Sequence, residues 1–173
     1  MGMTPLAGLM MGTRSGDIDP SIPGYLMKCT GMTSEEMDHV LNKQSGLEGV
    51  SGVSSDKRDL DVAVEAGIKR AILASEMFNY DIKKYVGAYA AAMGGVDCIV
   101  FTGGIGENDN GVREDVCSNM EFLGISIDEH KNLLRGMDIN DISAEDSRVK
   151  VLVIATNEEL MIARDTAAIV SAL

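Results

Sequence analysis

A glycine-rich turn near the middle of the chain is the first place where the residue types could support chemistry. The apolar run 98–101 ahead of it predicts a buried strand, since short apolar runs closed by glycines are typical of one. Gly103, Gly104 and Gly106 let the backbone take a positive φ and approach a ligand closely. Amide groups at the start of a following helix would favour phosphate. An ordinary strand-to-helix turn is the alternative interpretation.

The same pattern of strand, polar turn and helix occurs again near the end of the chain. The continuously apolar run 150–155 predicts a second buried strand, and 156–159 have the pattern of a capping box that opens a final helix to about residue 170. In open α/β sheets, neighbouring carboxyl ends of this kind form the binding crevice. Glu158 would stand at its edge and could hold Mg²⁺. Alternatively, it is a first-turn acid that favours the helix dipole.

Two further segments carry charged residues on flexible backbone. Arg14 lies between Gly12 and Gly16 in the irregular stretch 1–20, where it is either a ligand-binding arginine or a solvated one. The segment 46–55 predicts a flexible loop that leads into Asp56. This aspartate suits a helix N-cap, and a ligand contact through Asp56, backbone amides and Arg58 is the alternative.

Hydrophobic periodicity predicts the elements that must position these residues. Helices are expected over 21–29, 33–43 and 110–120, and a long one over 67–93 has a wide apolar face and ends at the glycine pair 94–95. A short strand is expected over 122–127, a small helix after Asp128, and irregular structure over 135–148. Strands that alternate with helices indicate the α/β class.

Composition limits the partners and the compartment. The 173 residues fit one ordinary domain, and the net charge of −12 argues against nucleic acid and anionic membranes, which demand a basic surface. Three scattered cysteines suggest neither a disulfide framework nor a zinc site. With no signal-like start and no apolar run of about 18 residues, a soluble cytoplasmic protein is expected.

Two common phosphate motifs do not fit the glycine turn. No Gly-Lys-Ser/Thr follows it, and Asp109 stands where a dinucleotide fingerprint needs its third glycine. Taken together and in order, the segments instead resemble the acetate kinase family. The resemblance rests on MGMTPLAGLMMGTRSGDIDP, SGLEGVSGVSSDKRDL, KYVGAYAAAMGGVDCIVFTGGIGEN and RVKVLVIATNEELMIARDT.

The resemblance implies a fold and shows what this chain lacks. Acetate kinases belong to the superfamily of sugar kinases and actin-like ATPases, whose α/β domains are ribonuclease-H-like. Residues 1–173 resemble an incomplete C-terminal nucleotide-binding domain, without its first strands and without the N-terminal domain. The family's His-Leu-Gly-Asn-Gly phosphate loop does not occur here.

The resemblance also implies roles for individual residues. Arg14 matches the catalytic arginine that contacts the transferring phosphoryl group, and Glu158 matches the magnesium-binding glutamate. Pro5 matches a residue that lines the pocket for the substrate's alkyl group. Two segments match nucleotide contacts, namely Asp56, Lys57 and Arg58, and the adenosine loop of Gly104, Ile105, Gly106, Glu107 and Asn108.

The expected function follows from the resemblance. The whole enzyme would transfer a phosphoryl group from Mg²⁺-ATP to acetate or a similar short-chain carboxylate, giving ADP and acetyl phosphate or its homologue. Family dimers form through this domain, so a homodimer is expected. The alternative is a non-catalytic nucleotide-binding or dimerisation fragment that needs a complementary chain. A dinucleotide-binding redox protein would need the complete glycine fingerprint.

Overall fold

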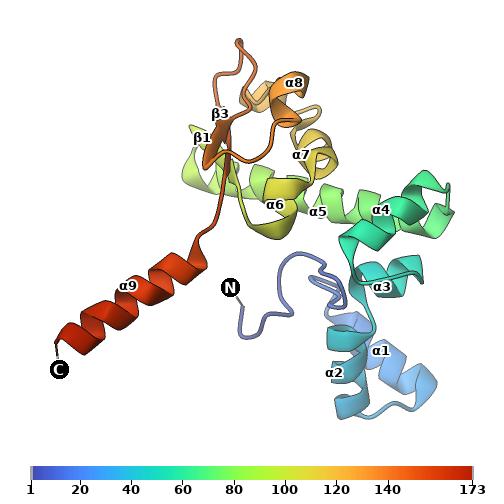
Figure 1. The fold of residues 1–173 in the computed structure, drawn as a ribbon. Coiled ribbons are helices and arrows are strands. Elements are labelled where there is room, and N and C mark those ends of the chain that lie inside the picture. The colour runs from blue at the N-terminus through green and yellow to red at the C-terminus, as the bar shows by residue number, and fades with distance from the viewer. Residues whose placement is uncertain (1, 173) are drawn as a thin grey trace. The chain divides into compact units, whose positions relative to one another are not determined.

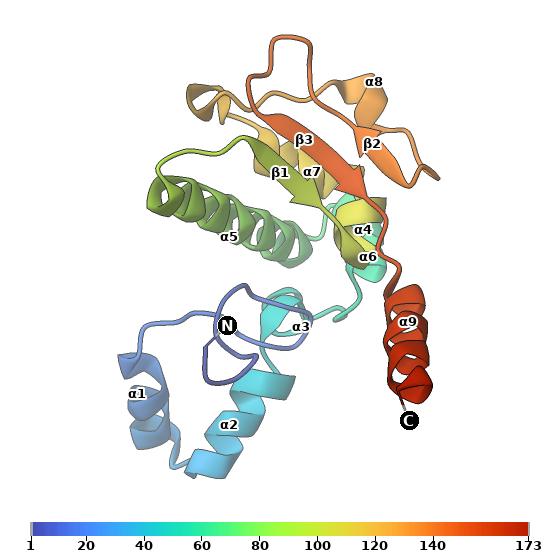
Figure 2. The same ribbon diagram turned by 90° about the vertical axis from the view of Figure 1, so that its left-hand side faces the viewer.

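The computed structural model describes residues 2–172 and is drawn in Figures 1 and 2. Its elements follow the chain in the order α1 (Ser21–Thr30), α2 (Ser34–Lys43), α3 (Gly46–Ser51), α4 (Lys57–Glu65), α5 (Lys69–Met93), β1 (Cys98–Phe101), α6 (Gly103–Asn108), α7 (Asn110–Cys117), the 3₁₀ turn η1 (Glu121–Leu123), α8 (Glu129–Asn132), β2 (Ile139–Asp141), β3 (Lys150–Ile154) and α9 (Glu158–Ser171).

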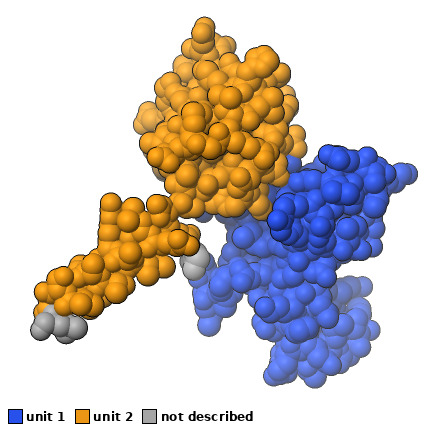
Figure 3. Space-filling view, in the orientation of Figure 1, with its two compact units in different colours: residues 1–89 blue, residues 90–173 orange. Residues whose placement is uncertain are grey.

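The chain divides into two compact units, residues 1–89 and residues 90–173, which Figure 3 colours blue and orange. The division falls within the long helix α5. The mixture of helices with a partly parallel sheet confirms the α/β class.

The first unit is helical and has its own apolar core. Buried side chains come from the opening segment, from α2 to α4 and from α5, namely Met10, Met37, Leu47, Leu60, Ala63, Ala71, Ala74 and Phe78. The capping box of α2 is present, since the Thr33 hydroxyl accepts from the Glu36 amide and the Glu36 carboxylate accepts from the Thr33 amide. The helices predicted over 21–29 and 33–43 are confirmed, because the structure has α1 and α2 there.

The prediction of a flexible loop over 46–55 was wrong in its first half, where the structure has α3. Glycines at 46 and 49 lower the helix propensity of this segment, but tertiary contacts override it. Leu47 is buried in the core, and its amide donates to the Met11 carbonyl at 2.9 Å. Gly46 takes a φ of 66°, which a residue with a Cβ adopts only with strain.

The second unit is built on a three-stranded sheet in the order β1-β3-β2. β1 and β3 run parallel, with Cys98 opposite Lys150 and Phe101 opposite Val153. β2 runs antiparallel to β3. The core lies between this sheet and the helices behind it, of which α7 is visible in Figure 2. Its buried apolar residues include Phe101, Val112, Val116, Met120, Ile125, Ile142, Val149, Val151 and Val153.

Three local predictions for the second unit differ from the structure. β1 is not a buried strand, because it forms an edge of the sheet among residues 2–172 and Val100 is 48% exposed. The segment 122–127 is not a strand but a 3₁₀ turn followed by an isolated bridge at Ile127. The supposedly irregular 135–148 contains β2, whose polar sequence Ile-Asn-Asp gives little strand signal.

The final helix follows β3 and exposes every residue from 158 to 172. Its N-cap is Asn157, whose side chain accepts from the Leu160 amide, so the predicted capping box with Thr156 at the cap was wrong. Within the described residues no helix has the length and apolarity needed to cross a membrane.

A glycine substitution tests the packing of α3 against the opening segment. A Cβ at Gly46 would collide with the carbonyl oxygens of Met11 and Arg14, and the positive φ adds strain. We expect Gly46→Ala to lower the free energy of unfolding by about 1–3 kcal/mol. Gly24, inside α1, has open space around it, so Gly24→Ala should leave stability unchanged or raise it by up to about 1 kcal/mol. Urea unfolding measures the free energy of unfolding of both variants. An equal change in the two variants would contradict the collision expected at Gly46.

Candidate active site

The carboxyl ends of β1 and β3 meet at one edge of the sheet, as the sequence predicted. Thr102 follows β1, and its hydroxyl donates to the Ile154 carbonyl at 2.8 Å. The Glu107 carboxylate of α6 joins the two turns. It accepts from the Gly103 amide at 2.9 Å, from the Thr156 amide at 2.9 Å and from the Thr156 hydroxyl at 3.0 Å. The two strand-turn-helix segments therefore form one continuous hydrogen-bonded edge.

Glu107 changes the interpretation of the glycine turn. The turn is the short helix α6, and its first amide is already satisfied by the Glu107 carboxylate. The Thr156 amide and hydroxyl and the Gly103 amide hold the pKa of Glu107 below its ordinary value, so the group is an anion at neutral pH. An anion at this position opposes a second anion. The prediction that amides at this helix start favour phosphate therefore does not hold for the Gly103 amide, and a neutral part of a ligand fits this first turn better.

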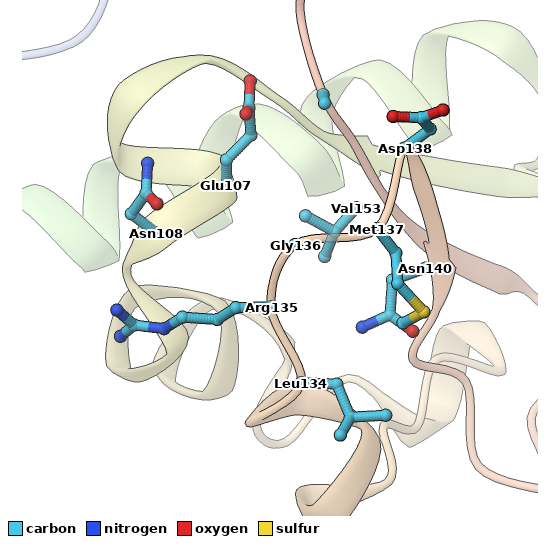
Figure 4. Close-up of a pocket in the computed structure, with 10 residues that line it drawn as sticks. Glu107, Asn108, Leu134, Arg135, Gly136, Met137, Asp138, Asn140 and Val153 are labelled. Carbon is cyan, nitrogen blue, oxygen red and sulfur yellow. The ribbon is translucent and has the colours of Figure 1, made fainter.

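A cavity of about 300 Å³ opens beside the end of α6, as Figure 4 shows. One wall is Glu107 and Asn108, and the opposite wall is the segment that leads into β2. The Asn108 side-chain amide donates to the Gly104 carbonyl at 2.9 Å, which leaves its oxygen able to accept a further hydrogen bond. The remaining lining mixes apolar and polar side chains from Leu134, Arg135, Gly136, Met137, Asp138, Asn140, Val153 and Ala155.

A buried arginine that the sequence did not single out connects the two walls of this cavity. The Arg113 side chain is fully buried. It donates to the carbonyls of Gly106 at 2.8 Å and Glu107 at 3.0 Å, and to the side chain and carbonyl of Asn132, each at 2.7 Å. An arginine in a short polar helix looks like a surface residue, and no local pattern signals this contact. Asn132 lies at the end of α8, directly before the cavity segment.

Glu158 lies in the first turn of α9, two residues beyond Thr156, and is exposed. Its carboxylate has no ion-pair partner among residues 2–172. The same part of the chain contains no group of three or more His, Cys, Asp or Glu side chains able to enclose a metal. One exposed carboxylate still suits Mg²⁺, which keeps several waters and is bound through one or two carboxylates together with substrate phosphates.

Arg14 lies on a well-fixed loop of the first unit. The loop is held by α2, because the Ser15 amide donates to the Leu41 carbonyl at 2.9 Å and the Thr13 hydroxyl donates to the Asn42 carbonyl at 3.0 Å. Within residues 2–172 the Arg14 guanidinium has no hydrogen-bonded or ion-pair partner. A half-buried arginine on a rigid loop without a protein partner is suited to an anionic ligand.

The other predicted residues of the first unit differ in how much they are already engaged. Asp56 is the N-cap of α4, and its carboxylate takes three bonds from Arg58, from the amide and from two guanidinium nitrogens. These bonds lower the pKa of Asp56 to about 2. The Arg58 side chain is nevertheless 88% exposed. Lys57 pairs with Asp61 along the helix, and Pro5 is exposed.

Comparison with known proteins gives a consistent result. A model of the acetokinase family matches residues 1–164. The acetate kinase of Phocaeicola vulgatus is 57% identical over 171 residues, which are 99% of this chain and 43% of that protein. The acetate kinase of Moorella thermoacetica is 56% identical over 172 residues, with the same coverage. The chain thus spans about 43% of the length of the curated relatives it matches.

Solved structures agree with the sequence comparison. The acetate kinase of Porphyromonas gingivalis superimposes with a TM-score of 0.93 at 54% identity, over 98% of this chain and 43% of that one. A propionate kinase from Francisella tularensis superimposes with a TM-score of 0.85 at 44% identity, over 94% of this chain and 41% of that one. The predicted fold class is confirmed.

The Glu107 bridge can be tested through its pH dependence. Because folding lowers the pKa of Glu107, its bonds are fully present above the ordinary glutamate pKa of about 4.3 and are lost as the pH falls through the lower, folded value. We expect the hydrogen-exchange protection of the Thr156 amide to fall in that acidic range, and Glu107→Gln to remove this dependence. Glu121→Gln, at an exposed site in η1, is the control. An unchanged Thr156 profile in Glu107→Gln would contradict the bridge.

Proposed function

Because the chain belongs to the acetokinase family, we propose that it supplies part of the active site of an ATP-dependent acetate kinase in the cytoplasm. The reaction would transfer the γ-phosphoryl group of ATP to acetate or a similar short-chain carboxylate, giving ADP and the acyl phosphate. The observation that best supports the proposal is the shared edge of β1 and β3, where Glu107 joins both turns beside a cavity.

The nucleotide's neutral part would bind at the end of α6. The cavity beside Glu107 and Asn108 offers amide and carboxylate acceptors together with apolar side chains, which suits the adenosine of ATP. Gly104, Ile105 and Gly106 would approach this ligand through their backbone, and the anionic Glu107 keeps phosphate away from the first turn of α6. Asp56 would hold the exposed Arg58 guanidinium in place for a nucleotide contact. Lys57, already paired with Asp61, would act in that turn through its backbone.

Arg14 would bind the phosphoryl group during transfer. Its guanidinium is planar and permanently charged, so it can donate to the equatorial oxygens on which charge accumulates. Fixing that guanidinium on a rigid loop lowers the cost of orienting it at the moment of reaction. Pro5 would line the pocket for the methyl group of acetate. Glu158 would hold Mg²⁺ directly or through water, and that ion would supply charge neutralisation on the phosphates.

The open edge of β1 favours a second candidate function. Val100 is 48% exposed, and the residues of α9 are all exposed, including Leu160, Met161 and Ile162. An exposed strand edge and an unpacked apolar helix favour association with another polypeptide. On this interpretation the 173 residues are a nucleotide-binding or dimerising fragment, active only with a complementary chain or as a homodimer.

A chimera separates these functions. Residues 1–173 replace the matched segment of the Phocaeicola vulgatus acetate kinase, and acyl phosphate formation from ATP and acetate is measured for the chimera and for the chain alone. We expect activity in the chimera and none in the chain alone. Arg14→Ala in the chimera should lower kcat by about 10³-fold or more, as for other cationic groups in phosphoryl transfer.

The matched control is Arg164→Ala, which removes an exposed arginine of α9. A chimera that folds but remains inactive would reject the catalytic proposal and favour the fragment. Equal losses in the two arginine variants would reject the specific role of Arg14.

The magnesium role of Glu158 has its own test in the same chimera. Glu158→Gln removes the charge while it keeps the size of the side chain, so the Mg²⁺ concentration for half-maximal activity should rise about tenfold. Glu159→Gln alters the neighbouring acid of the same first turn and should leave the magnesium requirement unchanged. Matching shifts in both variants would indicate a helix-dipole effect and contradict a role in metal binding.

A further inference from the structure

The loop that carries Arg14 is closed by two hydrogen bonds between Asp17 and Gly8. The Asp17 amide donates to the Gly8 carbonyl at 2.8 Å, and the Gly8 amide donates to Asp17 Oδ1 at 2.8 Å. These two bonds close residues 8–17 into a ring. Within it, the Met11 amide donates to the Arg14 carbonyl at 3.1 Å. The position of Arg14 therefore depends on how firmly the ring is held at its closure.

The closure is fastened from outside the loop. The Tyr85 hydroxyl, on α5, donates to Asp17 Oδ2, the oxygen that the Gly8 amide leaves unused. On the opposite side, the end of α2 holds the residues next to Arg14 through the Leu41 and Asn42 carbonyls. The loop is thus attached at two places, to α2 near Arg14 and to α5 at the closure.

We propose that Tyr85 is a positioning residue for Arg14, acting through the carboxylate of Asp17. This inference rests on the proposed function, because that function places Arg14 on the phosphoryl group. Tyr85 itself does not touch the ligand in this account. Its contribution is to keep the loop in the one geometry in which the guanidinium is already oriented.

The electrostatics of the contact agree with this role. Donation to Asp17 raises the pKa of Tyr85 to about 12, and the same bond, with that from Gly8, lowers the pKa of Asp17. Lys84, the preceding residue of α5, lowers the pKa of Asp17 further through its charge. A phenol that stays protonated beside a carboxylate that stays charged gives a charge-assisted hydrogen bond across the neutral pH range.

A purely structural role for Tyr85 explains the contact less well. Asp17 is exposed and Tyr85 is only half-buried, so their bond closes no cavity in the core. The core beneath α5 is filled by Ala71, Ala74 and Phe78. Removing only the hydroxyl therefore leaves the packing of the helix intact and isolates the loop contact.

The first test measures the loop itself in the 173-residue chain. We expect Tyr85→Phe to lower the hydrogen-exchange protection of the Gly8 and Asp17 amides about tenfold, as the loss of one charge-assisted bond predicts. The control Tyr80→Phe removes a hydroxyl from the same helix at a residue that is 63% exposed and whose ring lies near Lys84. It should leave both amides unchanged. Urea unfolding of both variants checks that each is folded.

The second test measures positioning in the active chimera. We expect Tyr85→Phe to lower kcat about tenfold while the KM for ATP changes by less than about twofold. In an Arg14→Lys background the same substitution should cost less than about twofold, because two residues that act through one group are not additive. Tyr80→Phe should change neither constant.

The outcomes separate the two proposals. Unchanged protection at Gly8 and Asp17 in Tyr85→Phe overturns the loop contact, whatever the chimera does. Reduced protection together with an unchanged kcat, or with an equal loss in the Arg14→Lys background, overturns the positioning role. An inactive chimera rejects the proposed function and the role that depends on it, while the exchange data still decide whether Tyr85 holds the loop.

Discussion

Parallel pairing of β1 with β3 is the constraint on which the candidate site depends. Phe101 stands opposite Val153, so the two strands end together and their turns leave from the same edge. Glu107 and Thr156, which are 49 positions apart in the chain, then come within hydrogen-bonding distance. A shift of the register would separate the Glu107 carboxylate from the Thr156 amide and hydroxyl, and both donors would lose this partner.

Much of this edge could be predicted from the sequence because its signals are local. Apolar runs at 98–101 and 150–155 identified β1 and β3, and Asp56 and Asp128 have the spacing of helix caps, which both are. The parallel arrangement followed from the general behaviour of strand-turn-helix units. The resemblance to one family then implied a shared ligand for the separate motifs.

The rest depends on contacts between distant residues, which local patterns do not encode. The helix α3 forms despite its glycines because Leu47 is buried and its amide reaches Met11. β2 pairs with β3 although Ile-Asn-Asp has little strand character. The exposure of β1 depends on what lies beside it, and the cavity wall of residues 134–138 depends on the burial of Arg113. Each is a tertiary effect that overrides propensity.

The burial of Arg113 also has an electrostatic consequence. Its guanidinium donates to neutral acceptors, the carbonyls of Gly106, Glu107 and Asn132 and the Asn132 side chain. Burial lowers the pKa of Arg113 and the nearby charge of Asp109 opposes this shift, so the group stays charged. In a chain of net charge −12, a permanent cation therefore lies against the backbone of α6, at the carbonyls of Gly106 and Glu107. Mobile salt ions attenuate fields between exposed charges, but they cannot enter this interior position. The cation therefore offsets part of the negative charge of Glu107 in α6, and salt weakens this compensation less than it weakens pairs of exposed charges.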